Sequence, residues 1–364
     1  MIKKAELTNA YKKNIWRVLL LIILNGLLLL SIASGSVSAK SHRIKSKVDN
    51  TVPMTVQVLP KLPPDNLGGR HLGYFVLPMV DHKERKETVR LYNPTNQTIK
   101  IRFKAADATT NNNGSVDYTG AHAVDHSLLK KPASSMIKVP QSLKLKPQAG
   151  RSVTFTVKNV ADNFKGQKAA ALNIIADGVN ANRSSIRNRY VYAIGVVLQG
   201  EKLPKRQLQR LKVSGIDVGL TKAKKAAIRV KLANPDATYL KQTKLQVKLV
   251  NRKYHFFKYQ DVKKDLKIAP NSSFKDDILL GGKRLVPGVY RLTMTAKTDR
   301  YHQTATKYVE ITKNKARFIN AHNYLYLKYR NRLLIGLLVL LIIVAALTIG
   351  LRRRFKRRKK DLNE

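Results

Sequence analysis

The sequence has no cysteine in its 364 residues, and its single tryptophan is Trp16. Without cysteine, the chain can form no disulfide scaffold, no thiolate zinc site, no iron–sulfur cluster and no cysteine nucleophile. Acidic residues are also scarce, because 22 Asp and Glu stand against 70 Lys and Arg, for a formal net charge of +48. A folded domain must therefore be held together by its own apolar core, and anionic partners are expected.

The positive charge belongs to the middle of the chain. Residues 40–330 contain 56 Lys and Arg against 19 Asp and Glu, a net charge of +37. Such a field attracts polyanions over a Debye length of about 10 Å at 0.1 M salt. Outside a cell these are teichoic acids and anionic glycans; nucleic acid is a lesser candidate, because no aromatic-rich recognition motif separates the cations. The alternative is that the cations form solvated strand faces without a ligand.

The N-terminus has the three parts of a secretory signal. Five Lys and Arg precede an apolar run over residues 18–30, which is followed by small residues that end in Val37-Ser38-Ala39. We expect a signal peptide over residues 1–39 and an exposed basic leader over residues 40–52. An uncleaved signal anchor is the alternative, and in both cases the chain that follows is exported.

A second apolar segment, residues 333–351, contains 19 residues without a charge. At about 1.5 Å per residue, a helix of this length nearly matches a hydrocarbon core about 30 Å thick, which predicts a transmembrane helix. The basic tail, residues 352–364, is expected in the cytoplasm by the positive-inside rule, either as a plain stop-transfer signal or as a lipid-binding patch. We therefore predict a single-pass cell-membrane protein with extracytoplasmic N-terminal domains. The expected cytoplasmic anchor consists of Arg352, Arg353, Arg354, Lys356, Arg357 and Arg358.

Between these two segments, apolar and polar residues alternate in short runs. Examples are Val153-Thr154-Phe155-Thr156-Val157 and Leu245-Gln246-Val247-Lys248-Leu249. This period of two is typical of strands with one face in water. Turn sequences such as Asn113-Gly114 and Pro287-Gly288 interrupt the runs frequently, so the pattern predicts an all-β fold.

The same plan occurs twice. Leu91-Tyr92-Asn93-Pro94 and Leu232-Ala233-Asn234-Pro235 each end one strand and precede another. We therefore predict two tandem Ig-like β-sandwich domains. Strands shared across the linker between the domains are the alternative. The predicted limits are 53–178 for the first domain, 179–189 for the linker, 190–312 for the second domain and 313–332 for a juxtamembrane helix.

Several short sequences resemble the WxL-interacting protein family of Gram-positive bacteria. In the first domain these are Thr55-Val56-Gln57-Val58-Leu59-Pro60 and the Asn-rich residues 108–118; in the second they include Ala269-Pro270-Asn271-Ser272-Ser273-Phe274. The resemblance implies a peptidoglycan-binding first domain and a second domain that binds host proteins, such as matrix proteins, for adhesion. It also implies that the protein works beside WxL-domain proteins at the cell surface. Because Trp16 is lost with a cleaved signal, the mature chain cannot carry a Trp-x-Leu motif itself, as expected for a partner of WxL proteins.

Catalysis is poorly supported by the sequence. The exported part contains no Gly-x-Ser-x-Gly, no His-Glu-x-x-His and no complete Walker loop. His122 and His126 could share a helical face as metal ligands, but a loop with two exposed histidines is the simpler interpretation, because no third ligand is suitably spaced. We predict a non-enzymatic binding protein without a cofactor or metal. An extracellular polyanion or nucleic-acid receptor is the alternative, and a hydrolase is the weakest one.

Exposed amides and tyrosines are the candidate contacts for peptidoglycan, teichoic acid or a partner strand. Asn113-Gly114 is also typical of a hairpin turn, so the Asn-rich segment can be structural, functional or both. The candidates in the first domain are Tyr74, Thr110, Asn111, Asn113, Gly114 and Tyr118, and those in the second domain are Tyr239 and Asn271.

Overall fold

The computed structural model describes residues 56–80, 84–159, 163–177, 189–204, 208 and 210–360. The chain divides into two compact units, Met1–Pro53 and Met54–Glu364, and every described residue belongs to the second. The expected signal peptide and basic leader lie outside the described residues. Below, "first half" denotes the described residues of 56–204, and "second half" denotes those of 210–322.

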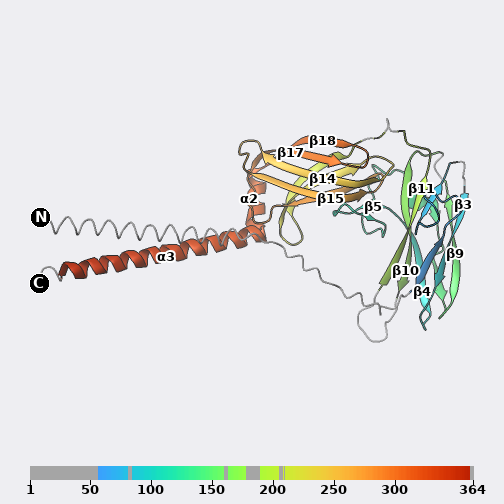
Figure 1. The fold of residues 1–364 in the computed structure, drawn as a ribbon, viewed down its shortest axis with the longest axis horizontal. Helices are drawn as coiled ribbons and strands as arrows, with labels where there is room; N and C mark the ends of the chain where they lie inside the picture. Colours follow the sequence, from blue (N-terminus) through green and yellow to red (C-terminus); the bar gives the residue numbers. More distant parts are fainter. Residues whose placement is uncertain are drawn as a thin grey trace. The chain divides into compact units, whose positions relative to one another are not determined.

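The described chain is mostly β, as its alternation predicted (Figure 1). The first half contains a four-stranded sheet in the order β1-β3-β9-β7 and a five-stranded sheet in the order β2-β11-β10-β4-β8. Neighbouring strands are antiparallel except for β2 and β11, which are parallel. The strands are β1 Gln57–Lys61, β2 Phe75–Pro78, β3 Glu84–Tyr92, β4 Ile99–Asp107, β7 Ile137–Lys138, β8 Ser142–Leu145, β9 Gly150–Lys158, β10 Gln167–Asp177 and β11 Arg189–Gln199.

The two sheets of the first half pack face to face. Along β9, the buried residues Val153, Phe155 and Val157 alternate with polar ones, so one face of the strand points to the core. Phe155 meets Phe75 of the other sheet edge to face, with 5.3 Å between ring centroids. A core between two sheets is the arrangement of a sandwich.

The second half repeats this arrangement. A three-stranded sheet has the order β12-β13-β16, and a four-stranded sheet has the order β15-β14-β17-β18. Ile228 of the first sheet and Val247, Tyr290 and Met294 of the second belong to one buried apolar cluster. The strands are β12 Lys212–Leu220, β13 Ala226–Asn234, β14 Leu240–Asn251, β15 Lys258–Ile268, β16 Ser272–Leu279, β17 Gly288–Lys297 and β18 His302–Ile311.

Strand β11 pairs across the predicted linker with the sheet of the first half, which is the shared-strand alternative that the sequence left open. Residues 190–198 were assigned to the second domain, but β11 pairs along its whole length with β10 and runs parallel to β2. Val196 and Leu198 are buried in the core of the first half. A run of apolar residues predicts a buried strand but does not identify its neighbours, and here the strand returns to the sheet that it has just left.

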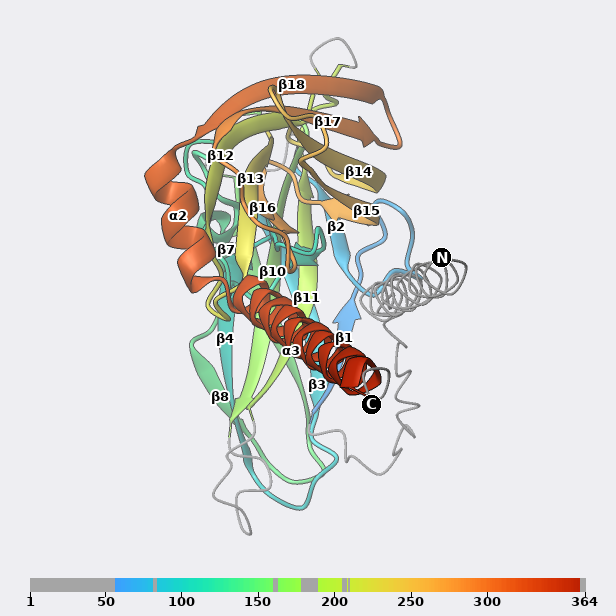
Figure 2. The same cartoon turned by 90° about the vertical axis from the view of Figure 1, so that its left-hand side faces the viewer.

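Two helices follow the last strand, and the break between them lies at Asn323 rather than at the predicted boundary between residues 332 and 333. Helix α2, Lys313–His322, packs beside β12, and helix α3, Tyr324–Lys360, leaves its end (Figures 1 and 2). Asn323 between them is fully buried, and its side chain joins Ala226 N at 3.4 Å and Gly281 O at 3.5 Å. Helix α3 contains the apolar residues 333–351, and among the described residues it is the one helix long and apolar enough to cross a membrane.

Candidate functional site at the junction of the two halves

A small hairpin carries most of the Asn-rich segment. Its strands are β5, Thr109–Thr110, and β6, Val116–Asp117. Asn111 shapes the turn, because its Oδ1 accepts hydrogen bonds from the backbone N of Asn113 and of Ser115, both at 3.0 Å. Gly114 N donates to Asn111 O at 2.9 Å, and Gly114 has a φ of +76°, which glycine adopts without strain. The amide that was a candidate ligand contact therefore holds the turn together.

The tip of this hairpin is docked against the second half. Thr110 is buried, its hydroxyl lies 2.7 Å from Ser272 Oγ, and it accepts a hydrogen bond from Ala269 N at 3.0 Å. Gly114 is also buried, and a Cβ there would lie 2.5 Å from Leu266 Cδ2. Two of the candidate contacts, Thr110 and Gly114, are therefore covered by the second half. Thr110 and Ser272 are 162 positions apart in the sequence, so short-range sequence patterns could not predict their contact.

Two candidate tyrosines meet across the same junction. The hydroxyls of Tyr118, from the first half, and Tyr239, from the second, are 2.9 Å apart. Tyr239 is only 6% exposed, and the Lys267 ammonium lies 5.3 Å from the centre of its ring. Burial raises the pKa of both phenols, so they are neutral hydrogen-bonding groups at physiological pH. An apolar cluster from both halves surrounds them: Ala108, Ala169, Val197 and Ala269, with Val76 and Val116 beside them.

A carboxylate that the sequence interpretation did not select completes the junction. Asp125 Oδ2 accepts a hydrogen bond from Ser273 Oγ at 2.7 Å and lies 3.2 Å from Lys231 Nζ. Hydrogen bonds from Ser127 and Ser273, assisted by Lys231, lower the pKa of Asp125 to about 2. Asp125 therefore carries a full negative charge at neutral pH. It joins a loop of the first half to strands β13 and β16, and no local pattern in the sequence marks it.

The remaining candidates fall into three groups. Asn271 shapes a turn within the second half, where its Nδ2 donates to Pro235 O at 2.9 Å and its φ is +47°. Tyr74 keeps 39% of its surface exposed, and Asn113 is exposed at the turn. The cations of the basic tail lie in the last turns of α3: Arg352, Arg353, Arg354, Lys356, Arg357 and Arg358.

The two histidines singled out in the sequence do not lie on a helix. The structure places them in the loop that follows β6, where His122 Nδ1 contacts Asp117 Oδ2 at 2.7 Å. Within the described residues, no three His, Asp or Glu side chains gather as a metal site.

Two sandwich-like halves with an extensive joint define a tandem binding module, and comparison with protein families identifies it. The WxL Interacting Protein peptidoglycan binding domain matches residues 56–176, and the WxL Interacting Protein host binding domain matches residues 181–321. The chain belongs to the WxL-interacting protein family, as its short sequences indicated. Both matched families are binding domains rather than enzymes, which supports binding at a cell surface.

Solved structures match the chain at low sequence identity and low TM-score. The YadV chaperone is 12% identical, over 70% of this chain and all of that one, with a TM-score of 0.28. The CupB2 chaperone of Pseudomonas aeruginosa is 14% identical, over 66% and 97% of the two chains, with a TM-score of 0.27. A chain of the CsuC-CsuE chaperone-tip adhesion subunit pre-assembly complex of Acinetobacter baumannii is 12% identical, over 64% of this chain and 94% of that one, with a TM-score of 0.32. Among curated proteins, none matches the chain.

Proposed function

We propose that this protein is a non-enzymatic, membrane-anchored surface protein that binds the cell wall and associates with WxL-domain proteins. The observation that carries the proposal is the tandem match to a peptidoglycan-binding domain and a host-binding domain. The wall ligand is peptidoglycan or an anionic polymer such as teichoic acid, which the net charge of +37 over residues 40–330 favours.

The proposed topology follows the order of segments along the chain. Residues 1–39 act as the signal, two Ig-like sandwiches lie outside the cell, and α3 crosses the membrane once. The first sandwich includes β11, because that strand is paired in its sheet. The basic end of α3 stays in the cytoplasm, where the positive-inside rule places clusters of Lys and Arg.

Two exposed features of the first half are proposed as contacts. Tyr74 and Asn113 keep exposed surface and remain the candidates for a wall glycan. Strand β1 lies at the edge of its sheet, and Leu59 on it is 65% exposed. Because an edge strand has unpaired backbone groups, β1 is the proposed place for a strand of a WxL partner to add.

A wall pulldown tests this function. The full chain in neutral detergent is incubated with purified walls, with and without teichoic acid, at 0.1 M and 0.5 M salt. A shaped site retains the chain at 0.5 M salt, because screening weakens simple charge attraction far more than close contacts. Loss from all walls at 0.5 M favours the polyanion receptor. Co-purification of a WxL-domain protein from solubilised envelope tests the second part of the proposal.

A further inference from the structure

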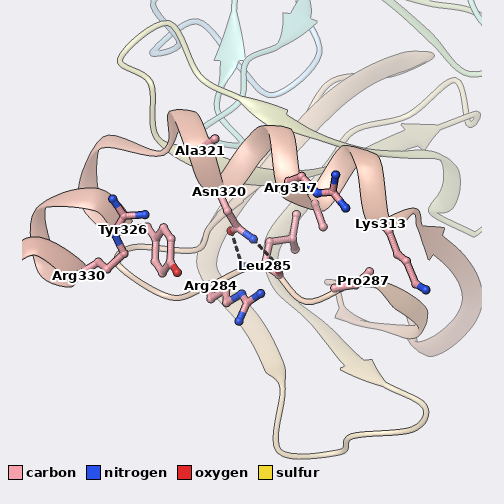
Figure 3. A pocket seen from close by; sticks show the side chains of 10 residues that line it. Arg284, Leu285, Pro287, Lys313, Arg317, Asn320, Ala321, Tyr326 and Arg330 are labelled. Atoms are coloured by element: carbon pink, nitrogen blue, oxygen red, sulfur yellow. Dashed lines mark hydrogen bonds between the residues drawn. The ribbon is translucent and has the colours of Figure 1, made fainter. Parts of the chain in front are cut away.

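A polar pocket lies where the second half meets α3. Its volume is about 370 Å³, and its walls come from α2, from the first turns of α3 and from the segment between β16 and β17. This volume is within the range of small-molecule sites, about 300–1,000 Å³. Figure 3 shows Tyr326 and Arg330 of α3 at one end of the pocket, Lys313 of α2 at the other, and Arg284 between them.

The three walls are held together by specific contacts. Asn320 of α2 accepts a hydrogen bond from Leu285 N at 2.9 Å and donates one to Leu285 O at 2.8 Å (Figure 3). Tyr329 of α3 packs so closely on Gly282 that a Cβ there would lie 2.0 Å from the tyrosine ring. The fold therefore fixes the position of the three walls relative to one another.

The lining of the pocket is cationic. Arg284, Lys313, Arg317 and Arg330 contribute to it, and it contains no Asp or Glu. In the part of the chain that the structure describes, no carboxylate lies within 4.0 Å of these four cations. Four positive charges around one cavity favour an anion, and guanidinium groups match the geometry of phosphate oxygens.

The position of the pocket along α3 indicates where that anion comes from. Arg330 and Tyr326 precede the first residue of the apolar segment, Leu333, by three and seven residues. At about 1.5 Å per residue, they lie roughly 5 and 10 Å from the start of that segment. The polar headgroup region of a bilayer is about 5–8 Å deep on each side, so Arg330 lies at headgroup level and Tyr326 just outside it once α3 spans the membrane.

Exposed aromatic groups occur at the same end of the second half. Phe256, in the turn between β14 and β15, is 72% exposed, and Phe318 of α2 is 59% exposed. The register of β14 with β17, and of β17 with β18, places that turn at the sheet end from which α2 departs. Aromatic side chains beside cations are typical of surfaces in contact with headgroups.

We propose that this pocket binds a glycerophosphate group, from the headgroup of an anionic membrane lipid or from a glycerol phosphate polymer. The phosphate is held by Arg284 and Arg330, while Tyr326 and the apolar wall at Leu285 and Pro287 contact the glycerol carbons. The inference rests on the proposed membrane anchoring, because α3 sets the depth of the pocket. Its consequence is that the second half is seated on the membrane surface by a bound lipid as well as by its helix.

Titration of the full chain in an uncharged detergent tests the proposal. Native mass spectrometry measures binding of short-chain phosphatidylglycerol and phosphatidylcholine. We expect phosphatidylglycerol to bind at least tenfold more tightly. The double variant Arg284→Gln/Arg330→Gln should lose about tenfold in affinity, because two charge-assisted contacts to phosphate are removed. Ala321→Trp, which adds a bulky ring at a residue that lines the pocket and keeps every charge, should lose as much.

A charge-matched variant provides the control. Arg90→Gln/Arg151→Gln removes two exposed cations from the first half and should leave lipid binding unchanged. Equal losses in this control and in the pocket variants, or no loss in either pocket variant, would overturn the proposal. All variants are compared by melting temperature, so that only folded protein is scored.

Two further measurements distinguish a lipid ligand from a polymer ligand, and lipid binding in the pocket from membrane anchoring by α3. Soluble polyglycerol phosphate that displaces phosphatidylglycerol identifies the polymer as a ligand, whereas failure to compete restricts the pocket to lipid. Carbonate extraction of membranes reports anchoring by α3 independently. If the chain stays in the membrane and still binds walls while the pocket variants bind lipid normally, the pocket proposal alone fails.

Discussion

At the junction, several polar side chains bond to other parts of the chain, although their chemical type also suits contact with a ligand. Asn111 looked like a hydrogen-bonding group for a ligand, yet its side chain accepts two backbone hydrogen bonds within the chain. Asp125 was not among the candidate contacts, yet it contacts Ser273 and Lys231 of the other half. A polar residue type shows what bonds a side chain can make, and only its neighbours determine which bonds are made.

Asp125 gives the junction a dependence on pH. Its folded-state pKa of about 2 lies below the ordinary value of about 3.9, so the unfolded chain takes up the proton first as the pH falls. The stabilisation is complete above a pH of about 4 and is lost as the pH falls toward 2. We expect Asp125→Asn to cost about 1 kcal/mol at pH 7 and to flatten the loss of stability between pH 4 and 2.

Thermal unfolding of the full chain at several pH values measures this effect. Asp265→Asn is the matched control, because Asp265 is exposed and its φ of +56° suits Asn as well as Asp. The control should melt like the parent chain at each pH. An Asp125→Asn variant with the parent's pH profile would show that this carboxylate does not stabilise the junction.

At the scale of elements, the β5–β6 hairpin acts as a clamp between the halves. Its turn backbone contributes directly, since Gly114 O accepts a hydrogen bond from Lys267 N at 2.9 Å and Asn112 O accepts one from Lys263 Nζ at 2.9 Å. The hairpin therefore depends on a glycine that is both left-handed in backbone conformation and closely covered.

Gly114→Ala should open this clamp. The new methyl group would overlap buried Leu266, which adds about 1–3 kcal/mol of overpacking to about 1 kcal/mol of backbone strain. Gly281→Ala is the matched control, because Gly281 also has a positive φ, +58°, with nothing within 4 Å of the new Cβ. We expect hydrogen exchange at the Lys267 amide to accelerate in Gly114→Ala alone. Equal exchange rates in both variants would mean that Leu266 moves aside freely.

At the scale of the whole molecule, few residues separate the second half from the apolar segment. Helix α2 has ten residues, about 15 Å in length, and the first turns of α3 follow it directly. If α3 spans the membrane, the second half lies within a thick cell wall. We therefore propose scaffolding of WxL proteins as the stronger role and direct adhesion to host proteins as the weaker one.

Antibody labelling of cells tests this ranking. An antibody against the exposed β14–β15 turn should label cells strongly only after wall digestion, with an antibody to an outer surface protein as the permeability control. Strong labelling of intact cells would reverse the ranking and favour direct contact of the second half with host proteins.

Short-range sequence patterns were sufficient to predict a mostly β fold, a long apolar helix and the protein family. Alternation in runs such as 153–157 predicts strands, because side chains on a strand point to opposite faces in turn. A 19-residue stretch without charge predicts a membrane-spanning helix from its length alone. The motifs around Asn234-Pro235 and Asn271 placed the chain in its family, and the tandem family matches confirm that assignment.

Contacts between distant residues were decided only by the tertiary structure. Four such contacts join segments that are far apart in the sequence: the pairing of β11 with its partner strands, the packing of Gly114 on Leu266, the contact of Tyr118 with Tyr239, and the pocket around Arg284. An alternation of apolar and polar residues shows that one face of a strand is covered, but it does not show which other segment covers that face. Which segment covers it depends on close packing and hydrogen bonding between residues far apart in the sequence, and these contacts exist only in the folded chain.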